Sequence, residues 1–107
     1  MTTFDQRKDA YETKFARDEE LKFKAVARRN KLLGLWAAGL LGKTGEAADA
    51  YAKTVVAADF EEAGDEDVFR KVRADLDAAG IAQSDHQIRR TMDELMATAV
   101  AQIEAGT

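Results

Sequence analysis

Few residues of this chain are of the types that carry out enzymatic chemistry. The chain has no cysteine, and His86 and Ser84 are its only histidine and its only serine. A zinc site needs three or four ligands, and a di-iron bundle needs a Glu-x-x-His motif from each of two helices. One histidine and no thiol cannot build either site. We therefore predict no catalytic residue, no metal ligand and a protein that is not an enzyme.

The segment 39–45, with the sequence GLLGKTG, comes closest to a phosphate-binding loop. The P-loop pattern requires a glycine where this chain has Ala37, and it requires a strand where this chain has a helical pattern. We therefore predict a helix end followed by a helix start. Backbone N–H groups at a helix start still suit an anion, so ADP or ATP is a candidate ligand, although no cofactor is required. The candidate nucleotide-binding residues are Arg28, Trp36, Lys43 and Thr44.

The N-terminal part of the chain differs from the rest in charge and in apolar content. Residues 1–31 carry nine Lys/Arg and six Asp/Glu, whereas residues 32–107 carry seven Lys/Arg and fourteen Asp/Glu. Phe4, Tyr11 and Phe15 are spaced i, i+7 and i+11, which places them on one face of a helix. A helix with an aromatic face but few core-forming residues usually presents that face to a partner protein. The candidate partner-binding residues are Phe4, Arg7, Lys8, Tyr11, Lys14 and Phe15.

Helical periodicity dominates the chain, and proline is absent. We predict helices over residues 5–41, from an N-cap at Thr44, from Asp65 to Gly80, and from a capping box at Ser84. Short loops between helices favour antiparallel neighbours, so the predicted fold is an all-α four-helix bundle over residues 19–107. The predicted core comprises Phe23, Val26, Leu33, Trp36, Leu40, Tyr51, Val55, Phe69, Val72, Leu76, Ile88, Met92 and Leu95.

Residues 1–18 are predicted to form a mobile, helix-prone extension that is disordered or frayed when the protein is free. An isolated segment of that length is marginal as a helix in water. The N-terminal residues also lack the apolar core of a signal peptide, and no apolar stretch approaches the roughly 20 residues of a membrane span. We therefore expect a soluble, cytoplasmic protein.

Several motifs occur together along the chain and cover essentially its full length. They are Phe4-Asp5, Lys14-Phe15-Ala16, Phe23-Lys24-Ala25, Ala27-Arg28-Arg29-Asn30, Leu33-Gly34, the segments 36–41 and 42–45, and the segment 59–72. With these motifs the chain resembles the ATPase inhibitor zeta subunits of α-proteobacterial F-type ATP synthases.

This resemblance implies an inhibitor of ATP hydrolysis by the catalytic head of the synthase. The N-terminal helix would insert at a catalytic interface between the large α and β subunits, with the central stalk as a further candidate contact. The resemblance also implies binding of ADP or ATP, and a cytoplasmic protein that is peripheral to the membrane through the synthase only.

Two other functions stay open from the sequence. One is a small adenine-nucleotide-binding regulatory protein without N-terminal inhibition. The other is a basic-helix protein that binds nucleic acid through the cluster Arg28-Arg29-Asn30-Lys31. The isoelectric point near 5.0 and the lack of a recognition-helix motif argue against the second, so we expect no nucleic-acid partner.

Overall fold

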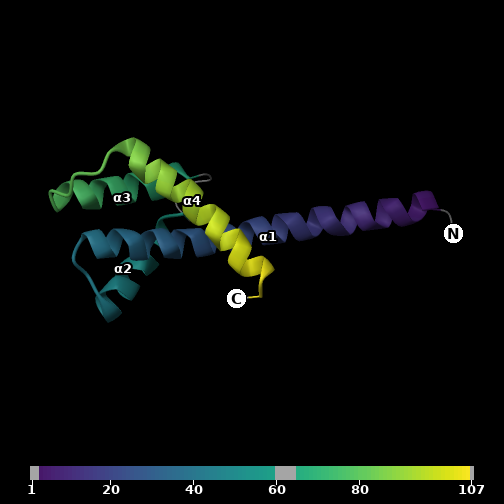
Figure 1. Cartoon of the computed structure of the whole chain (residues 1–107), viewed down its shortest axis with the longest axis horizontal. Coiled ribbons are helices and arrows are strands. Elements are labelled where there is room, and N and C mark those ends of the chain that lie inside the picture. The colour runs from purple at the N-terminus through teal and green to yellow at the C-terminus, as the bar shows by residue number, and fades with distance from the viewer. Residues whose placement is uncertain (1–2, 60–64, 107) are drawn as a thin grey trace.

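The computed structural model of the chain consists of four α-helices (Figure 1). It describes the backbone of residues 3–59 and 65–106, and the side chains of residues 19–59 and 65–106. The helices are α1 (Thr3–Leu40), α2 (Gly45–Ala58), α3 (Glu66–Ala78) and α4 (Asp85–Glu104). The described residues contain no strand. The predicted all-α, four-helix fold is confirmed.

Helix α1 is much longer than the other three helices and organises the molecule. Its C-terminal half packs against α2, α3 and α4, whereas its N-terminal half projects beyond them (Figure 1). The molecule measures 63 × 25 × 22 Å along its principal axes. A helix of 38 residues spans about 57 Å at 1.5 Å per residue, so α1 alone accounts for the long axis. We call the C-terminal half of α1 together with α2, α3 and α4 the body.

The ends of the helices follow the predicted signals. The Ser84 hydroxyl accepts a hydrogen bond from the Gln87 backbone N–H, and the Gln87 side chain accepts one from the Ser84 N–H, which completes the predicted capping box. Gly42 and Gly80 have positive φ angles of 77° and 72° and end α1 and α3. The Ile81 N–H then donates to the Leu76 carbonyl, which completes a Schellman motif at the predicted end of the helix at Gly80.

Thr44 and Asp65 hold the predicted N-cap positions of α2 and α3, but neither side chain makes a capping hydrogen bond. Asp65 instead pairs with Arg29 of α1 at 2.7 Å. The carboxylate therefore ties the start of α3 to the middle of α1.

The core lies where α1 is enclosed by the other helices. Leu33, Val55, Val72, Leu76 and Ile88 are fully buried. Trp36, Leu40, Tyr51 and Leu95 are partly buried and pack against this cluster, and Phe69 and Met92 belong to it. The predicted core is thus confirmed for the residues near the centre of the body.

Helices α1 and α2 approach each other closely at Gly34. A Cβ atom at this position would lie only 2.6 Å from the Ala52 Cα, a distance that no side chain tolerates. Glycine on one helix and alanine on the other therefore let the two backbones come together. This contact packs the middle of α2 directly against the middle of α1.

The prediction that Phe23 belongs to the core is wrong, because its side chain is 72% exposed. Ala25 is the first buried residue of α1 among the described side chains. Since α2 runs back along α1 from Ala52 and ends at Ala58, Phe23 lies about one turn beyond the region that α2 covers. The apolar spacing of α1 continues at Phe23. Helix α2, which would have to cover the ring, does not extend that far.

A matched pair of substitutions tests this boundary of the core. Leu33→Ala removes a fully buried side chain and should lower the free energy of unfolding by about 2–5 kcal/mol. Phe23→Ala removes a larger but exposed ring and should change it by less than about 0.5 kcal/mol. Thermal and urea unfolding of both variants would check this, and equal losses would contradict the assignment.

Candidate protein-binding surface

The predicted partner-binding residues all fall in the projecting half of α1. The backbone of residues 3–18 continues the helix without a break. The side chains of Phe4, Arg7, Lys8, Tyr11, Lys14 and Phe15 lie outside the described side chains. Their positions on one helical face therefore stay a prediction from spacing, as does the fraying of this segment in the free protein.

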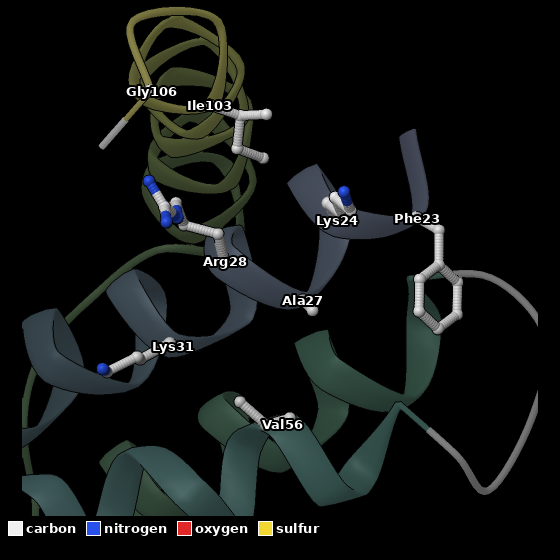
Figure 2. Close-up of a pocket in the computed structure, with 8 residues that line it drawn as sticks. All are labelled: Phe23, Lys24, Ala27, Arg28, Lys31, Val56, Ile103 and Gly106. Atoms are coloured by element: carbon white, nitrogen blue, oxygen red, sulfur yellow. The ribbon is translucent and has the colours of Figure 1, made fainter. Parts of the chain in front are cut away.

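An open groove lies at the base of the projection, where α1 emerges from the body. Phe23, Ala27 and Lys31 follow one another along α1 at i, i+4 and i+8, which keeps them on neighbouring positions of one face. Val56 of α2 borders the groove on one side, and Ile103 of α4 borders it on the other (Figure 2). The small side chain of Ala27 leaves the space between these two helices unfilled. We call this the basal groove.

Positive charge surrounds the apolar residues of the basal groove. Lys24, Arg28 and Lys31 are among its lining residues. Lys24 pairs with Glu20 at 3.1 Å, and both side chains are largely exposed. The Arg28 Nη1 donates to the Gln102 Oε1 at 3.5 Å, which draws α1 and the end of α4 together. The groove thus combines an exposed ring with cations on a body whose sequence is otherwise acidic.

The basic cluster at residues 28–31 divides between the surface and the interior. Arg29 is only 2% exposed, donates to the Asn30 Oδ1 at 2.8 Å and pairs with Asp65 at 2.7 Å. A buried guanidinium with these partners serves the packing of α1 and leaves no run of solvated basic residues for nucleic acid. From the sequence, the cluster was considered only as a whole and Arg29 was not singled out. The signal was available, because Arg29 precedes the core residue Leu33 by one helical turn.

The four candidate nucleotide-binding residues do not share one cavity. Arg28 lines the basal groove, whereas Lys43 and Thr44 are exposed at the junction of α1 and α2. About 18 Å of α1 separates residue 28 from residue 40 at the junction. Trp36 lies between these regions and packs against the core. Only Lys43, Thr44 and the N–H groups that begin α2 remain side by side as a possible anion site.

A polar cluster adjoins this junction. The Tyr51 hydroxyl donates to the Asp75 Oδ2 at 2.7 Å, and the Lys71 Nζ donates to the same oxygen at 2.8 Å. Burial raises the pKa of the Asp75 carboxyl, but the hydrogen bonds from Lys71 and Tyr51 and the charges of Lys71 and Lys43 bring that pKa below its usual value. Burial first, and then the hydrogen bond and charge of Asp75, raise the pKa of the Tyr51 phenol. The positive charge of Lys43 therefore interacts favourably with the Asp75 carboxylate.

The described residues hold no group of three or more His, Asp or Glu side chains that would bind a metal ion. Among the same residues, no helix has both the length and the apolar character needed to cross a membrane.

Comparison with known proteins connects this geometry to a family. The family model for ATPase inhibitor subunit zeta matches residues 1–102. The chain belongs to this family. A solution NMR structure is also similar, with 53% sequence identity and a TM-score of 0.72, covering 81% of this chain and 99% of that chain. The comparison with curated proteins gives no match.

Membership of the zeta family supports a role in inhibiting an ATPase and implies interaction with ATP synthase. It also indicates a regulatory, non-catalytic protein. The matched residues include both the projecting half of α1 and the body. The family is therefore defined by both parts together, and not by one helix.

The polar cluster generates a prediction about pH. A carboxyl whose pKa is lowered in the folded state contributes stability above its unfolded pKa of about 3.9, and this contribution is lost as the pH falls through the folded pKa. Tyr51→Phe removes one hydrogen bond to the ionised Asp75 and should cost about 1 kcal/mol at neutral pH. The deficit should shrink as the pH falls below about 4 and through the lowered pKa of the folded Asp75, where the carboxyl becomes protonated.

Urea unfolding between pH 7 and pH 3 measures this dependence. Tyr11→Phe is the matched control, because it makes the same chemical change outside the body and should leave stability unchanged at every pH. A Tyr51→Phe deficit of constant size across the range would show that the hydrogen bond to Asp75 is not its source.

Proposed function

We propose that this zeta-family protein inhibits ATP hydrolysis by inserting the N-terminal half of α1 as a helix into the catalytic head of an F-type ATP synthase. The insertion site is an interface between a large α and a large β subunit. The observation that carries the proposal is the length of α1, which projects well beyond the body as one continuous helix (Figure 1). The body then acts as a stop that docks outside the head.

The energetics of insertion favour an aromatic helix. Ordering a frayed segment costs conformational entropy, which contacts with the partner must offset. Burial of the rings of Phe4, Tyr11 and Phe15 at roughly 1.5–3 kcal/mol each contributes about 5–9 kcal/mol. Arg7, Lys8 and Lys14 would steer the helix toward an acidic surface and raise the rate of association. The central stalk of the synthase is a further candidate for contact with the inserted helix.

This function places the protein in the cytoplasm, at the membrane only through the synthase. Inhibition by insertion needs no cofactor. A helix that occupies a catalytic interface stops that interface from passing through its successive catalytic states, and it does so by occupying space alone.

Deletion of residues 2–18 tests the proposal. The shortened chain should keep the body folded, because every buried side chain of the described residues lies at Ala25 or beyond. It should no longer inhibit ATP hydrolysis by purified catalytic heads. Circular dichroism and thermal unfolding would establish that the body is intact. A shortened chain that inhibits as well as the full chain would move the inhibitory surface to the body.

Single substitutions locate the inhibitory contacts within the segment. Tyr11→Ala and Phe15→Ala should each weaken inhibition by about 2 kcal/mol, or roughly 30-fold in the half-inhibitory concentration, as for buried aromatic anchors. Thr13→Ala is the control, because spacing places it off the aromatic face. Loss of the same size at Thr13 would mean that the inhibitory contacts are not confined to the aromatic face.

We further propose weak binding of ADP or ATP at the junction of α1 and α2. The supporting observation is that the Thr44 side chain caps none of the N–H groups that begin α2, beside the exposed Lys43. Such N–H groups and a cation suit a phosphate. Arg28 would take part only through a distant charge, because it lines the basal groove.

An NMR titration with ADP measures this binding. Amide shifts should change most at residues 36–46, and Lys43→Ala should reduce the affinity. Changes that centre on α4, or no change at millimolar ADP, would exclude the junction. Inhibition that persists in the Lys43→Ala variant would separate the inhibitor from a protein that acts only by binding nucleotide.

A further inference from the structure

The basal groove has a feature that the proposed insertion of residues 3–18 does not use. Phe23 is the one large hydrophobic side chain that is strongly exposed among the described residues, at 72%. A ring in that state usually marks a surface that another molecule covers. Its position at one end of the groove, with Ile103 and Val56 on the two sides, gives it apolar neighbours that would share a ligand (Figure 2).

We infer that the basal groove is a second contact with the catalytic head and that it binds an acidic amphipathic segment of a head subunit. An apolar side chain of that segment would lie between Phe23, Val56 and Ile103. Carboxylates beside it would face Lys24 and Lys31. This inference rests on the proposed function and adds to it a docking site outside the inserted helix.

Charge complementarity selects the partner. Residues 32–107 carry seven Lys/Arg against fourteen Asp/Glu, so an acidic surface is repelled by most of the body. The basal groove is lined by three cations and is therefore the place on the body where such a surface is attracted. The exposed pair of Lys24 with Glu20 is worth little, so a carboxylate of the partner can replace Glu20 at small cost.

Position selects the same partner. The groove lies at the base of the projecting helix, so inserting that helix would bring Phe23 and Lys24 to the outer rim of the head (Figure 1, Figure 2). From residue 23 to residue 31 the groove runs about 12 Å along α1, enough for roughly two turns of a partner helix.

Three variants of the full-length chain test the groove. The double variant Lys24→Glu/Lys31→Glu reverses two of its cations, and Phe23→Ala removes its ring. Lys53→Glu/Arg90→Glu is the matched control, because it makes the same change of net charge at exposed positions that do not line the groove. The replaced groove side chains are exposed, so thermal midpoints should stay near that of the wild-type chain.

Binding to purified heads and the half-inhibitory concentration for ATP hydrolysis are measured together at low and high salt. Both groove variants should weaken binding by roughly tenfold or more, as expected for a central anchor and its charges. The control should stay within about twofold, and the loss in the charge variant should shrink as salt rises.

The outcomes separate the groove from the proposed insertion. Groove variants that bind and inhibit like the wild-type chain overturn the groove while the insertion stands. An equal loss in the control overturns it too, because net charge alone would then explain the effect. Groove-dependent binding to anionic lipid vesicles or duplex DNA, with head binding unchanged, assigns the groove to another partner and also overturns it. A wild-type chain that binds the head but fails to inhibit contradicts the insertion and leaves the groove comparison readable from binding.

Discussion

Helix α1 has two environments along one continuous backbone, and the rest of the structure depends on where one gives way to the other. From Ala25 onward one face of α1 is buried against the other helices, and Gly34 approaches Ala52 of α2 closely. The first half of α1 projects beyond α2, α3 and α4 (Figure 1). A helix stabilised by packing at one end leaves its other end available to a partner, and contacts with the partner can then order that segment.

Polar contacts of the body hold α1 in place just beyond the base of its projecting half. Arg29 reaches from α1 to Asp65 at the start of α3, and Arg28 reaches to Gln102 near the end of α4. Arg89 of α4 pairs with Glu66, next to Asp65, and its guanidinium lies 3.9 Å from the centre of the Phe69 ring. These contacts join α1, α3 and α4, which are distant in sequence. A body whose helices are joined in this way suits the proposed role of a stop that docks outside the head.

Much of this arrangement could be predicted from the sequence, because local signals carry it. The capping box at Ser84 and the glycine ends at Gly42 and Gly80 depend on residues within one turn. The exposure of Phe23 could not be predicted in the same way, because it depends on how far α2 extends along α1, and that is a matter of packing between residues distant in sequence. The same limit explains why the predicted nucleotide-binding residues do not form one site. Spacing along the sequence did not reveal how far Arg28 lies from Lys43 along the body.

Hydrogen–deuterium exchange of the full-length protein, free and bound to purified catalytic heads, tests the central claim most directly. The backbone amides of residues 3–18 should exchange rapidly in the free protein and become strongly protected in the complex, as for a segment that becomes helical inside a partner. The core amides of α2, α3 and α4 should exchange at the same rates in both states. Protection confined to those three helices, with residues 3–18 still exchanging rapidly in the complex, would contradict the account.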